Sequence, residues 1–134
     1  MKKKNREVMS KDELLKSAGN QMTFHSKGWG HELWIVNNEK YCGKILFIKK
    51  GKRCSWHYHE VKDETFYLQT GKLKVWLSNS DNRSEAYEKI LTSGDSLHIY
   101  TGLRHQMLAL EDSELFEFST QHFDEDSKRI EKGD

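Results

Sequence analysis

The segment HYHEVKDE, residues 57–64, brings His57, His59 and Glu64 close together in the sequence. On a β-strand alternate side chains share a face, so the two histidines point the same way. Glu64 opens the next strand after a short turn, which can bring its carboxylate back beside the imidazoles. Two neutral imidazoles and a carboxylate form a facial set for a divalent first-row metal, with positions left open for water or substrate. Burying these groups without a partner would be costly, so the spacing predicts a metal site.

A bare His-x-His pattern also occurs by chance at solvated strand ends, so the surrounding residues matter. Gly51 lies six residues before His57, and Gly71 lies seven residues after Glu64. Far downstream, the segment GDSLHIYTGLRH adds two further glycines and a third histidine, which are Gly94, Gly102 and His105. This combination of types and spacings is far more specific than the two histidines alone.

Together these residues resemble the two motifs of the cupin superfamily, G-x5-H-x-H-x4-E-x6-G and G-x5-P-x-G-x2-H, over roughly residues 40–110. Every position fits except the proline, which is Tyr100 here. The resemblance implies a small antiparallel jelly-roll β-barrel. It also implies a metal held by four residues, with the last joining from a strand across the barrel: His57, His59, Glu64 and His105.

Short segments rich in β-branched and aromatic residues, separated by Gly, Asn, Asp and Ser, support an all-β fold. They cover residues 32–37, 43–49, 54–59, 64–70, 72–77, 86–91, 95–100, 104–110 and 114–120. Before them, Ser10 followed by Glu13 is a capping-box pattern that predicts a short helix ending at Gly19. We expect a single domain with an N-terminal extension over 1–22, a barrel over 23–120 and a charged tail over 121–134.

The composition sets limits on function. A chain of 134 residues suits one domain with one core. Its net charge of +1 gives no reason to expect nucleic acid or an anionic membrane as a partner. It contains no apolar stretch near the roughly 20 residues that span a bilayer, and its start lacks the apolar region of a secretory signal. Cys42 and Cys54 are too few for a disulfide framework, so we expect reduced thiols in a cytoplasmic protein.

The segments around the motifs resemble the cupin-type mannose-6-phosphate isomerases. That family has a KPWG-like segment before a Tyr-x-x-Lys strand, and the matching residues here are Lys27, Trp29, Gly30, Tyr41 and Lys44. The metal segment aligns without gaps through Ser55, His59 and Glu64, and the acidic C-terminal run leads to Arg129. Where that family carries a metal-binding glutamine, this chain has His57.

This resemblance implies aldose–ketose isomerisation of a sugar phosphate through an enediol, with a divalent Zn, Mn, Fe or Ni ion polarising the sugar oxygens. We interpret Lys44 as a catalytic candidate, since an inward lysine in a barrel needs an anion beside it or a depressed pKa. The family resemblance makes Arg129 the second catalytic candidate. Arg53, Lys62 and Arg104 are candidates to hold the phosphate, although Lys62 and Arg104 also fit solvated surface cations. The general base stays unassigned.

Two other classes of function stay open. One is a sugar-binding or regulatory cupin without turnover, and the other is a metal-dependent oxygenase, because a histidine-rich site with open positions suits oxygen chemistry. Fold alone does not separate them. We also expect a homodimer, because the apolar stretch LWIVN (33–37) would otherwise form an exposed edge strand.

Overall fold

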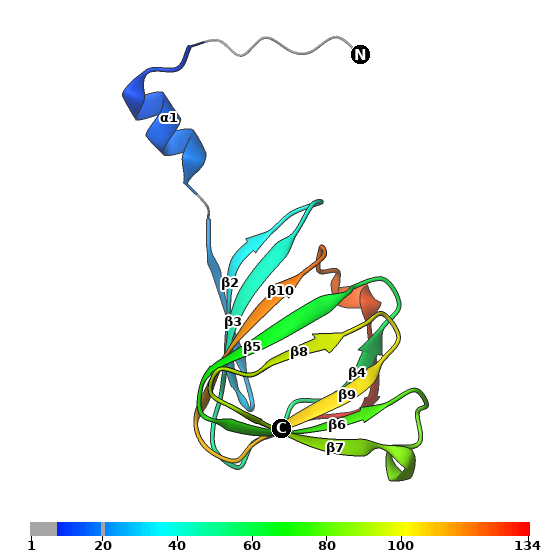
Figure 1. Cartoon of the computed structure of the whole chain (residues 1–134). Helices are drawn as coiled ribbons and strands as arrows, with labels where there is room; N and C mark the ends of the chain where they lie inside the picture. Colours follow the sequence, from blue (N-terminus) through cyan, green and yellow to red (C-terminus); the bar gives the residue numbers. More distant parts are fainter. Residues whose placement is uncertain (1–7, 20) are drawn as a thin grey trace.

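The computed structural model describes residues 8–19 and 21–134 (Figure 1). Residues 1–7 and 20 of the expected N-terminal extension lie outside the described residues. Helix α1 spans Lys11–Ala18, and the Ser10 hydroxyl accepts a hydrogen bond from the backbone N–H of Glu13 at 3.2 Å, as the capping pattern predicts. Gly19 is the C-cap that follows the helix, and no helix residue is buried. None of the helices in the described part of the chain is long and apolar enough to cross a membrane.

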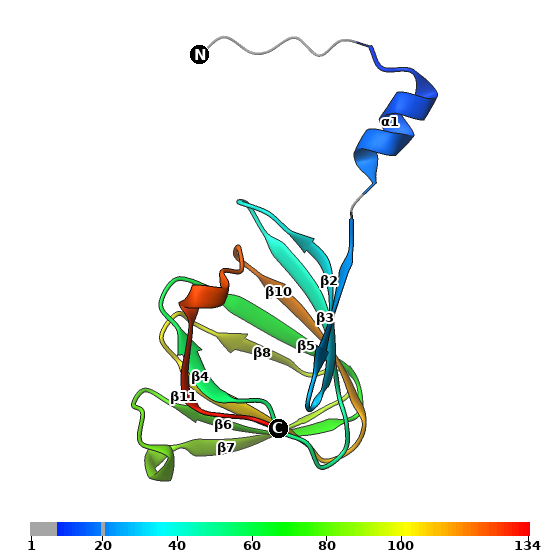
Figure 2. The same ribbon diagram turned by 180° about the vertical axis from the view of Figure 1, so that it is seen from behind.

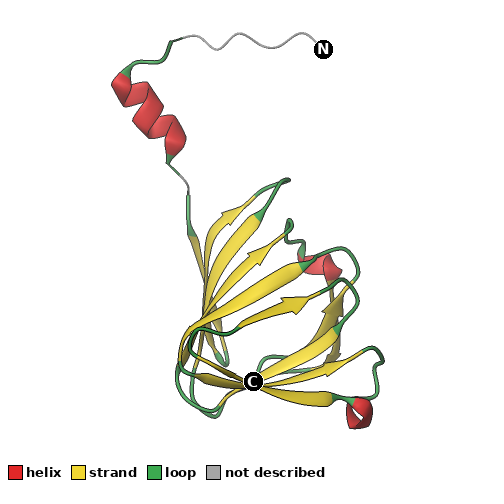
Figure 3. Cartoon of the chain, viewed as in Figure 1, coloured by secondary structure: helices red, strands yellow, loops and turns green. Residues whose placement is uncertain are grey.

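Two antiparallel sheets face each other and form the body of the molecule (Figure 2). The first contains, in spatial order, β1 (Thr23–Lys27), β2 (Gly30–Asn37), β3 (Cys42–Ile48), β10 (Ser113–Ser119), β5 (Glu64–Thr70) and β8 (Ser96–Ile99). The second contains β11 (Ser127–Glu131), β4 (Trp56–His59), β9 (Arg104–Ala109), β6 (Lys72–Ser78) and β7 (Tyr87–Thr92). Short 3₁₀ turns η1 (Arg83–Glu85) and η2 (Asp124–Asp126) interrupt the connections. This mostly β, two-sheet architecture confirms the predicted fold class (Figure 3).

The inner faces of the sheets follow the period of two that strands impose. In β3, buried residues alternate with half-buried ones along the whole strand. The apolar core comes from these inner positions of both sheets and includes Leu46, Ile48, Leu68, Leu73, Val75, Leu91, Met107 and Leu115. Each fully buried aliphatic side chain contributes about 1.5–3 kcal/mol to folding, so this core supplies the main stabilisation.

Buried polar residues gather at one end of the same inner strands. In β3, Lys44 precedes buried Leu46, and in β5 Glu64 precedes buried Phe66. In β10, which runs antiparallel to both, Glu117 follows Leu115. The three polar side chains therefore lie at the same end of the sandwich. One end is a hydrocarbon core, and the other is a polar site.

All nine predicted strands are present, and the structure adds two that the sequence did not reveal. The segments TFHSK (β1) and SKRIE (β11) carry few apolar residues, and no residue in either strand is buried. Their positions come from backbone pairing with β2 and β4, which lie at the edges of the two sheets without them. We expected the barrel to end at residue 120, but β11 extends the second sheet to Glu131.

The turn before β9 forms without the proline of the cupin motif. The backbone N–H of Leu103 donates to the carbonyl oxygen of Tyr100 at 3.0 Å, which closes a four-residue turn. Gly102 occupies its third position with a φ of 90°, a conformation that side-chain-bearing residues rarely adopt. The glycine, rather than a proline, therefore sets the spacing that delivers His105.

Candidate metal centre

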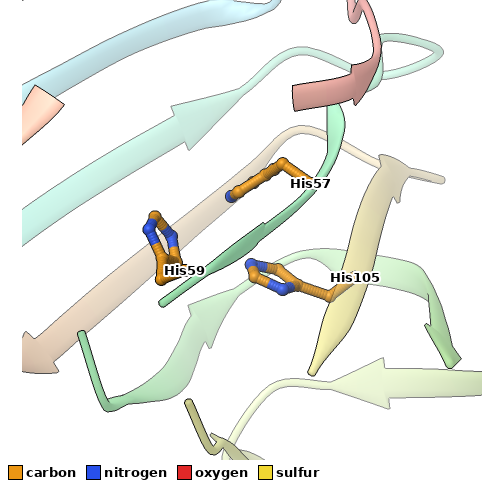
Figure 4. Close-up of side chains that lie close together, drawn as sticks. All are labelled: His57, His59 and His105. Carbon is orange, nitrogen blue, oxygen red and sulfur yellow. The ribbon is translucent and has the colours of Figure 1, made fainter. Parts of the chain in front are cut away.

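Three imidazoles meet at the polar end of the sandwich (Figure 4). His57 and His59 alternate on β4 and so face the same side, as the sequence predicts. His105 comes from β9, where it lies directly opposite His57 in the ladder. One ligand atom from each ring lies within 4.8 Å of the others. This set of three histidines can hold a metal ion.

Hydrogen bonds to backbone carbonyls orient two of the rings. His57 Nδ1 lies 3.0 Å from the carbonyl oxygen of Ser55, and His105 Nδ1 lies 2.9 Å from that of Leu103. A carbonyl oxygen only accepts, so these contacts favour the tautomer with the proton on Nδ1 and the lone pair on Nε2; the Ser55 hydroxyl also lies 3.0 Å from Nδ1 of His57. Fixing the tautomer in this way is the usual support for a metal-binding histidine.

Glu64 borders the three imidazoles. Its Oε2 atom lies 3.4 Å from Nε2 of His59 and 3.4 Å from Nε2 of His105, and has no hydrogen-bond partner although it is buried. Two atoms that each lie about 2.1 Å from one ion at a tetrahedral angle are about 3.4 Å apart. The spacing therefore fits a shared cation. Glu64 as a fourth ligand stays a prediction.

Removal from water sets the charge of the site. Burial lowers the pKa of His57 to about 3 and that of His105 to about 4, and it lowers the pKa of His59 further still. All three imidazoles are therefore neutral at pH 7, which is the form that binds metals. Burial, together with nearby Glu117, raises the pKa of Glu64 to about 8. A divalent cation beside this carboxyl group would favour its charged form.

Lys62, which we predicted to hold a phosphate, is buried and forms ion pairs with two carboxyl groups of the protein. Its Nζ lies 3.3 Å from Oε1 of Glu64 and 3.1 Å from Oε2 of Glu117. Burial acts to lower the pKa of Lys62, but the two carboxylates outweigh it and raise the pKa. Sequence analysis did not single out Glu117, although it shares the inward face of β10 with Leu115 and alternation could have revealed it.

Lys44 points inward, as expected, and has an anion nearby. Only 3 % of it is exposed, and its Nζ lies 3.6 Å from Oε1 of Glu32 and 4.2 Å from the ring centre of Trp34. Glu32 also accepts a hydrogen bond from the Trp34 indole at 2.8 Å. Sequence analysis missed Glu32, whose segment HELWIVN has no clear alternation of polar and apolar residues.

A cavity of about 260 Å³ joins these groups. Lys44, Lys62 and Arg129 line it together with the three histidines and Glu64. Arg129 reaches it from β11, where it is paired with His57. The structure thus brings the predicted metal ligands, both catalytic candidates and Lys62 to one place.

The other two predicted phosphate-binding residues lie elsewhere. Arg104 donates to Oδ1 of Asp81 at 2.9 Å, and its guanidinium lies 3.7 Å from the ring centre of Tyr58. The backbone of Arg53 forms a bridge to Leu108. Neither arginine lines the cavity. Strict alternation places Arg53 on the same face as His57, but regular strand β4 begins only at Trp56, so the alternation does not extend back to Arg53.

Comparison with known proteins identifies the fold family. The family model described as Cupin domain matches residues 45–118, which include the four predicted metal ligands. The chain belongs to the cupin family. The model covers cupin domains in general and does not single out the mannose-6-phosphate isomerases.

Solved structures agree with this cupin assignment. The capsular polysaccharide assembling protein CapF from Staphylococcus aureus matches with a TM-score of 0.71 and 18% identity, over 83% of this chain and 34% of that chain. Oxalate decarboxylase from Bacillus subtilis matches with a TM-score of 0.71 and 17% identity, over 81% of this chain and 30% of that chain. This cupin thus spans about a third of the length of these proteins. Identities this low show a shared fold alone. No curated protein matches the chain.

The first prediction concerns metal binding. Protein stripped with a chelator should bind one divalent ion, and His59→Ala or His105→Ala should weaken the affinity by more than about 100-fold, because each removes a ligand. Competition with a chelating dye and elemental analysis measure this. His98→Ala is the control, since His98 pairs with Asp63 on the outer face of β8. Equal affinity in all four proteins would contradict the assignment.

The second prediction concerns the pH dependence of the metal-free protein. In the unfolded chain these histidines become protonated near pH 6.5. In the folded protein they become protonated only at about pH 4 or below. The free energy of unfolding should therefore fall as the pH drops from about 6.5 to 4.5. Glu64 has a raised pKa, so its contribution to the free energy of unfolding increases as the pH falls. This single group does not outweigh the three histidines.

Urea unfolding at pH 7, 6 and 5 measures this dependence. His57→Gln should show a shallower loss of stability with acid, because one proton-accepting group is gone. His98→Gln should keep the wild-type slope. A stability that does not change between pH 6.5 and 4.5 would show that the imidazoles are not held neutral by burial.

Proposed function

We propose that this cupin binds an anionic sugar, such as a sugar phosphate, above a divalent metal and isomerises it between aldose and ketose. The observation that carries the proposal is Lys44, a cation almost wholly removed from water that lines the same cavity as the three imidazoles. Its ion-pair partner Glu32 lies 3.6 Å away, beyond normal hydrogen-bonding distance. A buried ammonium with capacity to spare suits an anionic ligand.

The size of the cavity supports a small substrate. Its volume of about 260 Å³ lies near the lower limit for small-molecule sites. Arg129 lines this cavity from β11 and is exposed, so it can meet a charged group that enters from solvent. A phosphate or carboxylate would then lie between two cations, Lys44 and Arg129.

A divalent ion held by His57, His59, Glu64 and His105 would supply a Lewis acid for the carbonyl and hydroxyl oxygens of the sugar. Lys44 would offset the negative charge that develops as the enediol forms. We assign the proton transfer to Glu32, which lines the cavity beside Lys44. Its carboxylate would take the proton from C2 and return it to C1, while the hydroxyl proton moves between the two oxygens. No oxidant or reductant is consumed.

Glu117 is a poorer candidate for the base. It is buried, but Lys62 and Lys44 outweigh the effect of burial and lower its pKa, and the Ser119 hydroxyl also donates to it at 2.8 Å. A carboxylate held so firmly in its charged form is a weak proton acceptor. Its contacts fit a role in keeping Lys62 in place.

The third prediction is turnover. The metal-loaded protein should interconvert mannose 6-phosphate and fructose 6-phosphate, or another pair in a panel of free and phosphorylated aldoses. Glu32→Gln and Lys44→Met should lower kcat/KM by at least about 10²-fold, because they remove proton transfer and charge stabilisation. Arg129→Ala should mainly raise KM. Coupled assays and NMR detection of deuterium incorporation at C1 or C2 measure these effects.

Arg104→Ala serves as the control, since Arg104 contacts Asp81 and Tyr58 outside the cavity. Saturable binding of a sugar phosphate without turnover on any sugar would replace the isomerase with a binding cupin. Absence of both binding and turnover would reject the proposal and leave the fold and the metal centre.

We also propose that two copies pair through the outer face of the six-stranded sheet. The stretch LWIVN is not an edge, because β2 is paired with β1 on one side and β3 on the other. The outer face nonetheless carries aromatic neighbours, with ring centres 6.2 Å apart for Tyr67 and Phe116 and 6.5 Å apart for Phe116 and Phe118. Phe118 is 59% exposed. An apolar surface of this kind favours a protein partner.

The fourth prediction tests this pairing. Light scattering at micromolar concentration should give twice the 15.8 kDa monomer mass. Phe118→Glu should shift the protein toward monomer, because a buried unpaired charge would oppose association. Tyr87→Glu is the matched control, since Tyr87 is 81% exposed but lies on β7 of the other sheet. A monomeric wild type would exclude the homodimer.

A further inference from the structure

The turn between two predicted metal ligands is held by a carboxylate from the C-terminal segment. Asp126 Oδ1 accepts hydrogen bonds from the backbone N–H groups of Glu60 and Val61, each at 2.9 Å. Its Oδ2 accepts from the N–H of Lys62 at 2.9 Å, across 64 positions of sequence. These three residues follow His59 and lead toward Glu64, so Asp126 fixes the backbone that carries both.

The same carboxylate lies behind His59. Asp126 Oδ2 is 3.8 Å from Nδ1 of His59, and that buried nitrogen has no hydrogen-bond partner. The other two imidazoles each donate Nδ1–H to a backbone carbonyl. His59 Nδ1 has no such carbonyl, and Asp126 is the carboxylate on that side of the ring. At 3.8 Å the two atoms are beyond hydrogen-bonding distance, so the ring must shift toward Asp126 to donate to it.

We infer that Asp126 is a positioning residue for the metal centre, which orients His59 through Nδ1 and holds the turn that delivers Glu64. It is not placed as a ligand, because it lies on the Nδ1 side of His59, whereas Nε2 of that ring faces Glu64. A carboxylate behind a metal-binding histidine fixes the ring and makes its other nitrogen a stronger donor. The inference needs only the metal centre and is independent of the isomerase activity.

This arrangement connects the metal centre to a part of the chain outside the matched cupin model. Asp126 is 6% exposed and directly precedes β11, where Ser127 lies opposite His59 and Arg129 opposite His57. The model match ends at residue 118. The C-terminal segment therefore supports the ligands from behind while it brings Arg129 to the cavity. Metal binding and the order of this segment should be thermodynamically coupled.

The fifth prediction tests Asp126 in the full chain with Co²⁺ as the probe. Asp126→Asn keeps the shape but places an NH₂ donor among N–H donors, so Co²⁺ affinity should weaken by about 10–100-fold. The visible absorption of the bound Co²⁺ should also change, since the ligand geometry changes. Glu125→Gln, in the same 3₁₀ turn, is the matched control and should stay within about twofold of wild type.

A purely structural role predicts a different result. Asp126→Asn would then lower the melting temperature of the metal-free protein while Co²⁺ affinity and the absorption spectrum matched those of Glu125→Gln. That outcome would overturn the inference.

A measurement on the wild type keeps the inference testable if Asp126→Asn does not fold. Amide hydrogen exchange should slow at least about tenfold on Zn²⁺ binding at Glu60, Val61 and Lys62, and also within β11. Unchanged exchange in β11 on Zn²⁺ binding would overturn the proposed coupling.

Discussion

The space between the two sheets holds imidazoles and carboxylates that are buried too deeply to form hydrogen bonds with water. His59, Glu64 and His105 are almost fully buried, and both His59 Nδ1 and Glu64 Oε2 have no hydrogen-bond partner. Such groups cost several kilocalories per mole unless something binds them. A cation at the meeting point of the three histidines would bind Glu64 Oε2 and the Nε2 atoms of His59 and His105 together, whereas His59 Nδ1 faces Asp126. The stability of this end of the sandwich and its proposed chemistry would then depend on the same interaction.

A network of buried charges surrounds that point. Lys62 lies between Glu64 and Glu117, and Lys44 lies beside Glu32 farther along the cavity. Each cation compensates a carboxylate that would otherwise be isolated in a medium of low dielectric constant. Lys62 is fully engaged in this way, whereas Lys44 keeps capacity for a further anion. The difference between the two lysines separates a structural cation from a candidate substrate-binding one.

The C-terminal segment adds residues to the site that lie outside the matched cupin region. Asp126 supports the turn between His59 and Glu64, and Arg129 lines the cavity from the neighbouring position to His57. Strand β11, which carries Arg129, also extends the second sheet beside β4. A charged stretch that looks like a solvated tail in sequence is therefore part of the site, and the backbone ladder places it there rather than any apolar periodicity.

Local rules acting over a few residues were enough to predict much of this protein from sequence. Alternation along a strand placed His57 and His59 on one face, and the resemblance of the two histidine-containing segments to the cupin motifs implied the fold. The strands β1 and β11, the partners Glu32 and Asp126, and the exclusion of Arg53 and Arg104 from the cavity were decided only by the tertiary structure. Each depends on pairing between segments far apart in the chain, as with Asp126 and the turn at Lys62. Side-chain type and local spacing carry no information on such contacts, because sheet register and burial arise only when both sheets are assembled.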